Sequence, residues 1–122
     1  PTLLELSGQE IPENMTGKSL VPILTGKAAP DHHRDFVRCE YYDALKARDG
    51  TLATMYRDRR YKLVVYHGRD YGELYDLQED PDEFDNQWEN SAFANIRADL
   101  IKRSFDTSVI AMDRGPRRIG GI

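Results

Sequence analysis

The stretch that decides the fold of this 122-residue chain is residues 51–77, TLATMYRDRRYKLVVYHGRDYGELYDL. Three of its segments alternate between two sides, as β-strands do, and are rich in Val, Tyr and Thr: residues 51–57, 61–67 and 73–77. The connectors between them, 58–60 and 68–72, are short. Short connectors force neighbouring strands to run antiparallel, so the stretch predicts two consecutive hairpins.

The segments on either side complete an α+β pattern. In residues 36–42, Val37, Cys39 and Tyr41 alternate with polar or bulkier residues, which predicts a fourth strand with Cys39 as a small buried residue. A helix is predicted from an N-cap at Asn90 to about residue 112. Its apolar residues form two stripes, which predicts a broad buried face: Phe93, Ile96 and Leu100, then Ile101, Phe105, Val109 and Met112. We therefore expect a four-stranded antiparallel sheet packed by one long C-terminal helix.

The first 34 residues have the composition of an arm of helices and loops that precedes the sheet. Residues 2–7 resemble the last turns of a helix that Gly8 ends, and residues 19–25 a short helix capped by Ser19. The expected division is an arm over 1–34 and a sheet-and-helix subdomain over 35–122. The arm carries many exposed-looking leucines, so we expect an apolar patch that could drive self-association.

Composition excludes several classes of function. The net charge is −4, which gives no whole-domain electrostatic case for nucleic acid. No apolar run approaches the length of a membrane span, and the single cysteine excludes a disulfide within the chain. The start, Pro1 without Met, indicates a piece processed or cut from something longer, and no signal peptide is readable, so the compartment stays undetermined.

No catalytic constellation is complete in these residues. Residues 17–19, GKS, lack the upstream glycine of a phosphate-binding loop, and the acidic stretch 76–85 lacks the Gly and Glu of an EF-hand, which favours a solvated turn. The pair His32 and His33 has no zinc-ligand spacing. The basic residues around 57–62 favour a solvated hairpin tip or the binding of an anionic sugar or carboxylated partner over single-stranded nucleic acid.

Two groups of segments together resemble type I sulfatases, of the alkaline phosphatase superfamily. The first is PTLLELSG at 1–8, with the segment GKSLVPILTG at 17–26. The second is YKLV at 61–64, followed by GELYDLQEDPDE at 72–83. Their order and spacing cover nearly the whole chain and are those of the C-terminal portion of such an enzyme.

The resemblance implies what the parent enzyme does and what this chain lacks. Type I sulfatases hydrolyse sulfate esters with a formylglycine, made from the Cys or Ser of C/S-x-P-x-R, and a divalent cation, usually calcium. That motif is absent here, and Cys39 is followed by EYYD. The resemblance therefore places no catalytic or metal-binding residue in this chain; the large upstream domain is its partner, and a periplasmic or secreted location is compatible with such a parent.

For the residues of this chain, the resemblance implies only an indirect role in the activity of the parent enzyme. A small domain that packs on the catalytic one can shape the substrate cleft, and the rim residues we expect are His32, His33, Arg34, Glu40 and Tyr42. Two alternatives stay open at this point. One is a self-contained binding module, for example for a sulfated glycan; the other is a fragment of a related phosphomonoesterase or phosphonate hydrolase.

Overall fold

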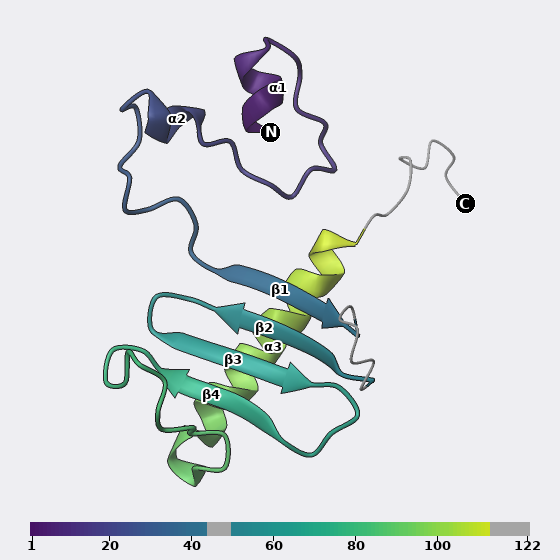
Figure 1. The fold of residues 1–122 in the computed structure, drawn as a ribbon, viewed down its shortest axis with the longest axis vertical. Coiled ribbons are helices and arrows are strands. Elements are labelled where there is room, and N and C mark those ends of the chain that lie inside the picture. The colour runs from purple at the N-terminus through teal and green to yellow at the C-terminus, as the bar shows by residue number, and fades with distance from the viewer. Residues whose placement is uncertain (44–49, 113–122) are drawn as a thin grey trace, which may run out of the picture. The chain divides into compact units, whose positions relative to one another are not determined.

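The computed structural model describes residues 1–43 and 50–112, in two compact units. One comprises Pro1–Arg34 together with the chain from Val109 onward, and the other comprises Asp35–Ser108. The elements follow one another as α1, α2, four strands, a 3-10 turn and α3 (Figure 1). None of the helices in the described part of the chain is long and apolar enough to cross a membrane.

The arm contains the two predicted helices, both short. Helix α1 spans Thr2–Leu6, and Gly8 follows it with a φ of 71°, the left-handed conformation that glycine adopts readily. Helix α2 spans only Val21–Leu24; its N-cap is Leu20, although the Ser19 hydroxyl accepts a hydrogen bond from Val21 N at 3.2 Å. Five large apolar side chains of the arm are exposed: Leu3, Leu6, Met15, Leu20 and Leu24.

The four strands form one antiparallel sheet in the order β1-β2-β3-β4. They span Val37–Tyr42, Leu52–Arg57, Tyr61–Tyr66 and Gly72–Asp76. The β2–β3 and β3–β4 hairpins are the two that the short connectors predicted. At the first of these turns the Asp58 carboxylate accepts hydrogen bonds from Arg60 N and Tyr61 N at 2.8 and 2.7 Å, which fixes the reversal of the chain.

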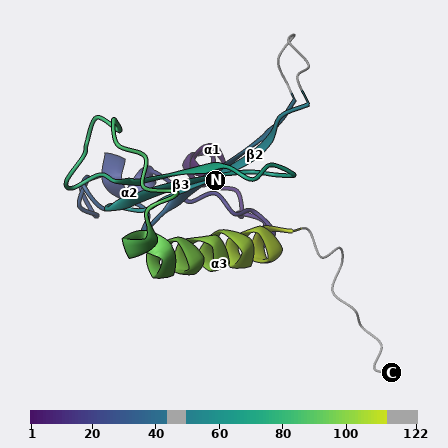
Figure 2. The same cartoon turned by 90° about the horizontal axis from the view of Figure 1, so that it is seen from below.

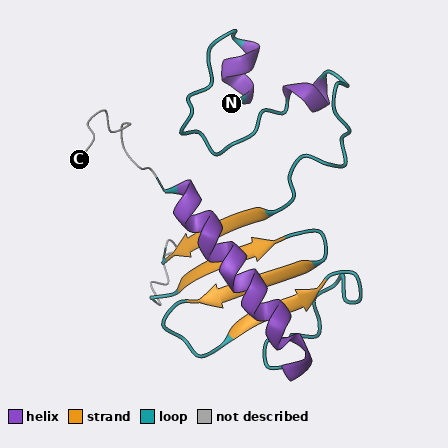
Figure 3. Ribbon diagram, turned by 180° about the vertical axis from the view of Figure 1, so that it is seen from behind, coloured by secondary structure: helices purple, strands orange, loops and turns teal. Residues whose placement is uncertain are grey.

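Helix α3, Ala94–Ala111, covers one face of this sheet (Figures 2 and 3). The buried core comes from both layers: Tyr56 on β2, Leu63 on β3, Leu74 on β4 and Leu100 on α3. The Asn90 side chain accepts a hydrogen bond from Ala92 N at 3.0 Å, as a cap does, but it begins a 3-10 turn, Ser91–Phe93, which leads into α3. The predicted α+β architecture is therefore confirmed.

The segment between β4 and the helix protects the outer edge of the sheet. The Asn86 side chain accepts from Leu74 N at 3.0 Å and donates to Gly72 O at 3.0 Å, so it satisfies the backbone groups of β4 that lack a neighbouring strand. Trp88 then packs against Gly72. A Cβ at position 72 would lie 2.5 Å from Trp88 Cε3, so the indole requires a glycine there.

Two of the burial predictions are wrong. Cys39 is exposed, because its side of β1 faces away from α3. On α3 the first stripe packs on the sheet, but Ile101 is 40% exposed and Phe105 67%, so the second stripe is not buried within the unit. Ser104 is buried instead, since the helix crosses the sheet along its 100–104 side.

Candidate functional site

An arginine on the first strand is the centre of a polar cluster beneath the C-terminal half of α3. The strand alternation puts Arg38 on the side that faces the helix, where its Nη2 group donates to Glu40 Oε1 and to Ser108 Oγ. The Arg38 side chain is only 15% exposed, and its buried Nε has no hydrogen-bond partner among the described residues. The ion pair lies within β1, and the hydrogen bond to the Ser108 hydroxyl joins this strand to the helix.

Glu40 is held as a carboxylate by its neighbours. The hydrogen bond from Arg38, followed by one from the Tyr42 hydroxyl, lowers the pKa of Glu40 below its usual value. The same Tyr42–Glu40 bond raises the pKa of Tyr42, because the phenol must remain protonated to donate it. Both side chains are exposed at the end of β1, so their bond is screened by water.

A pocket of about 240 Å³ lies beside this cluster. Its apolar wall is formed by Val65, Ile101 and Phe105, and its polar wall by Thr54, His67, Ser104 and Ser108. Thr54 Oγ1 and His67 Nε2 are 2.8 Å apart and join β2 to the residue after β3. Chemically, the pocket can accept a small group with an apolar face and a few hydroxyls.

A hydroxyl beside an imidazole is part of a nucleophile–base pair, but the rest of such a site is not present around Thr54. A nucleophile requires access to substrate and a base oriented by a third group. Thr54 is only 5% exposed, and no described side chain is shown to orient the other nitrogen of His67. We interpret the pair as a cross-strand link.

A second pocket, of about 340 Å³, lies beside the N-terminal half of α3 and is lined by charges that are already paired. Arg103 on the helix forms an ion pair with Asp99 at 2.7 Å and lies 4.0 Å from Asp58 of the β2–β3 turn. Mixed, mutually neutralised charges give this pocket a structural role in tying α3 to the turn.

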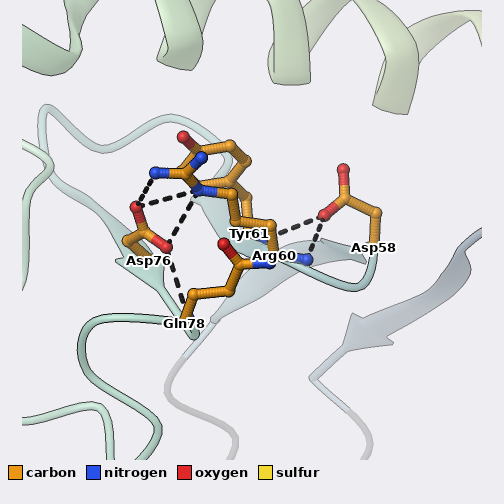
Figure 4. A network of polar contacts seen from close by, with 5 residues as sticks. All are labelled: Asp58, Arg60, Tyr61, Asp76 and Gln78. Atoms are coloured by element: carbon orange, nitrogen blue, oxygen red, sulfur yellow. Dashed lines mark hydrogen bonds and ion pairs between the residues drawn. The ribbon is translucent and has the colours of Figure 1, made fainter.

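The aspartate of the ELYDL segment belongs to a network that holds the β2–β3 turn against the end of β4 (Figure 4). Arg60 Nη2 donates to Asp76 Oδ2 at 2.8 Å, and Arg60 Nε donates to both Asp76 oxygens at 3.1 and 3.2 Å. Gln78 N donates to Asp76 Oδ1 at 3.3 Å. These contacts, with that of Arg60 first, lower the pKa of Asp76.

The acidic stretch 76–85 is therefore not simply a solvated turn. Asp76 is buried, at 5% exposure, and the Asp80 carboxylate accepts from Phe84 N and Asp85 N at 3.1 and 2.8 Å. Glu83 pairs with Lys62, so two cations of the basic hairpin, Arg60 and Lys62, are neutralised within the chain. Among the described residues no group of three or more His, Cys, Asp or Glu side chains could hold a metal ion.

The five predicted rim residues are divided between the two units. His32 and Arg34 are exposed and His33 is half-buried in the arm, whereas Glu40 and Tyr42 lie on β1. That all five line one cleft stays a prediction. The sequence reasoning missed Arg38 and Ser108, which are 70 residues apart; the available signal was that Arg38 alternates onto the same side of β1 as Glu40.

A four-stranded antiparallel sheet covered by one long helix places the chain in a class, the C-terminal domain of sulfatases. The structure of a 2-O GAG sulfatase superposes with a TM-score of 0.78 at 29% identity, over 93% of this chain and 24% of that one. A phosphonate monoester hydrolase from Silicibacter pomeroyi superposes with a TM-score of 0.74, also at 29% identity, over 93% of this chain and 24% of that one.

The particular family follows from the sequence match. The chain belongs to the family described as N-sulphoglucosamine sulphohydrolase, C-terminal, whose model matches residues 1–109. The Delta 4,5-hexuronate-2-O-sulfatase of Bacteroides thetaiotaomicron is 32% identical, over 96% of this chain and 26% of that protein. The N-acetylglucosamine-6-O-sulfatase of the same organism is 27% identical, over 95% and 21%. The chain thus spans about a quarter of the length of these relatives.

Proposed function

We propose that the chain serves as the C-terminal domain of a longer sulfatase that hydrolyses sulfate esters of sugars. The observation that carries the proposal is the family match over residues 1–109, in a chain that corresponds to only 21–26% of the sugar sulfatases it resembles. In this proposal the domain completes the fold and presents Glu40 and Tyr42 toward the substrate cleft.

The catalytic groups of such an enzyme do not fit onto this chain. The sequence has no C/S-x-P-x-R segment in which a formylglycine could form, and Cys39 lies on the exposed side of a strand. The described residues also offer no metal-binding cluster for a divalent cation such as calcium. In the proposal, the remainder of the longer enzyme provides both, and no catalytic step involves a residue of this domain.

The isolated chain tests this division of labour. We expect no hydrolysis of 4-nitrophenyl sulfate by the 122-residue chain, with or without calcium. Turnover above background at stoichiometric protein, abolished by a substitution in the Thr54–His67 pair and not by a surface control such as Arg69→Met, would refute it.

A related ester is the second candidate, because phosphonate monoester hydrolases superpose on this chain about as well as sulfatases do. The two functions differ in the atom that is attacked, which is sulfur in a sulfate ester and phosphorus in a phosphonate ester. In this proposal, residues outside this chain determine which ester is cleaved. Parallel assays of the longer enzyme with aryl sulfate and aryl phosphonate monoesters separate them: a larger kcat/KM on the sulfate supports the first candidate, and the reverse supports the second.

A further inference from the structure

The pocket beside the C-terminal half of α3 is built from both layers of the unit that holds the sheet. Thr54 on β2 and Val65 on β3 lie directly opposite each other and contribute its strand side, together with His67, which contacts Thr54. The helix side consists of Ile101, Ser104, Phe105 and Ser108. These four positions have the spacing of one helix face, so regular secondary structure holds both walls in place.

The lining of this pocket differs from that of a packing defect. Cavities that stay empty in proteins are lined by apolar groups. Here, four of the seven described lining residues carry a side-chain group that forms hydrogen bonds: Thr54, His67, Ser104 and Ser108. A pocket with one apolar and one polar wall suits a ligand that has the same two sides.

The apolar wall presents an aromatic ring to solvent. Phe105 is 67% exposed and Ile101 is 40% exposed, although both line the pocket. The face of an aromatic ring carries partial negative charge and attracts the C–H groups of a flat ligand ring. Phe105 therefore provides a stacking surface, and Ile101 and Val65 extend it.

The polar wall can both donate and accept hydrogen bonds. Arg38 Nη2 donates to Ser108 Oγ, so the Ser108 hydroxyl keeps its proton for another acceptor. In the pair of Thr54 Oγ1 and His67 Nε2, 2.8 Å apart, the threonine oxygen retains a lone pair with either tautomer of the imidazole. Groups that donate and accept at once, such as the hydroxyls of a ligand, match this wall.

The charges around the pocket favour an uncharged ligand. None of the described residues that line it is an Asp, Glu, Lys or Arg. The register partner of Thr54 on β1 is Glu40, whose side chain is 37% exposed, whereas the side chain of Arg38, its ion-pair partner, is 15% exposed. The more accessible charge beside the pocket is thus a carboxylate, which repels a sulfate or carboxylate group on a ligand.

The size of the pocket limits the ligand to one ring. Its volume of about 240 Å³ lies below the range of about 300–1,000 Å³ that is typical of pockets for drug-sized ligands. A single ring with a C–H face, several hydroxyls and no charge is the chemistry that the two walls select. A pyranose has all of these features.

We propose that this pocket binds one uncharged pyranose ring, with a C–H face on Phe105 and hydroxyls toward Thr54 and Ser108. The choice of a sugar among hydroxylated rings rests on the proposed function, in which the longer enzyme acts on sulfate esters of sugars. The site holds an unsulfated sugar unit of a glycan and leaves the charged groups of that glycan in solvent.

The test is a titration of the 122-residue chain with methyl β-D-glucopyranoside and methyl β-D-galactopyranoside, followed by NMR. The resonances of Val65, Ile101 and Phe105 should shift with at least one of the two sugars, with a Kd of roughly 1 mM, as the low affinity per atom of small ligands implies. The resonances of Phe84, which is 88% exposed and lies outside the pocket, should not shift. The absence of any shift at Val65, Ile101 and Phe105 with both sugars overturns the proposal.

Two further ligands show what the pocket recognises. The methyl uronide of the sugar that binds carries a carboxylate on the same ring, and it should bind at least about tenfold more weakly. Cyclohexanol has the apolar ring but a single hydroxyl, and it should also bind at least about tenfold more weakly, because it leaves the polar wall without partners. If either ligand binds as tightly as the uncharged sugar, the proposal is overturned.

Phe105→Ala removes the stacking surface and should weaken binding of the sugar by about five- to tenfold. The thermal midpoint should move by less than about 3 °C, because the Phe105 side chain is 67% exposed. The matched control is Phe84→Ala, which removes an equally large exposed ring elsewhere and should leave the affinity unchanged. Wild-type affinity in Phe105→Ala, or an equal loss in both variants, overturns the proposal.

A second pair of variants examines the polar wall. Ser108→Ala should weaken binding by about threefold or more, because it removes a hydroxyl that lines the pocket. The control is Thr107→Val, since the Thr107 hydroxyl donates to Ser104 O at 2.8 Å and is not part of the lining. If Ser108→Ala binds the sugar as tightly as Thr107→Val does, the proposal is overturned.

The outcomes also separate this inference from the proposed function. A chain that binds the sugar, within a full-length enzyme that cleaves no sulfate ester, refutes the function and supports the site. An active full-length sulfatase whose 122-residue domain binds neither sugar refutes the site alone.

Discussion

Replacing Arg60 by methionine tests whether the ELYDL aspartate has the structural role that the network gives it. Arg60→Met keeps most of the length of the side chain but removes all three hydrogen bonds to the Asp76 carboxylate. The Asp76 side chain is 7% exposed, and after the substitution its carboxylate keeps backbone N–H donors, those of Gln78 and Glu79, but no cation. The substitution therefore leaves a buried charge without its counter-ion, which lowers the free energy of unfolding.

The expected loss is about 2–3 kcal/mol of unfolding free energy. Removing one partner of a fully buried ion pair costs about 3–5 kcal/mol, but Arg60 is 48% exposed, so water already screens part of the interaction. For a domain of this size, about 2–3 kcal/mol corresponds to a drop in Tm of roughly 10–20 °C. Asp76→Asn, which removes the charge itself, should cost less than Arg60→Met.

Urea unfolding followed by circular dichroism measures this loss, with Arg69→Met in an exposed turn as the charge-matched control. The folded-state pKa of Asp76 is lowered, so its stabilising effect is present above its unfolded pKa and is lost as the pH falls through the folded value. The gap between wild type and Arg60→Met should therefore close in acid. A loss within about 0.5 kcal/mol of the control, or a gap independent of pH, would refute the reasoning.

Three further outcomes follow from the same structure. Leu74→Ala should lower the unfolding free energy by about 2–5 kcal/mol in a urea titration, because Leu74 is fully buried; a loss below about 1 kcal/mol would contradict the core assignment. Gly72→Ala should cost about 1–3 kcal/mol and change the fluorescence of Trp88, the one tryptophan, since the new methyl group displaces the indole; an unchanged spectrum would disprove the contact. The bond to Glu73 raises the pKa of Tyr66 to about 12, so one tyrosine should ionise late in an absorbance titration and earlier in Glu73→Gln; no difference between the two curves would exclude the bond.

The sheet was predictable because its signals are local. The connectors 58–60 and 68–72 leave no room for anything but hairpins, and Leu63 and Leu74 alternate as buried strand residues do. Likewise, Gly8 ends α1 in the left-handed conformation that its position indicated.

The side of the sheet on which the helix lies was not predictable, and the wrong predictions follow from this. Alternation shows that Cys39 and Arg38 lie on opposite faces of β1, but it does not show which face α3 covers. We expected the apolar residues of β1 to be the buried ones, whereas the helix lies on the Arg38 side and Ser108 meets it there. Where the helix crosses the sheet depends on packing between residues far apart in the chain, so no local pattern located the Arg38 cluster or its pocket.

The central claim, that this chain is an inert domain of a longer sulfatase, is tested most directly by one comparison of rates. The measurement is steady-state hydrolysis of an aryl sulfate by the full-length enzyme and by the 122-residue chain, at equal molar concentration and with calcium present. The account predicts turnover by the full-length enzyme and none by the chain alone. Turnover by the chain alone, or a full-length enzyme that cleaves no sulfate ester, would contradict it.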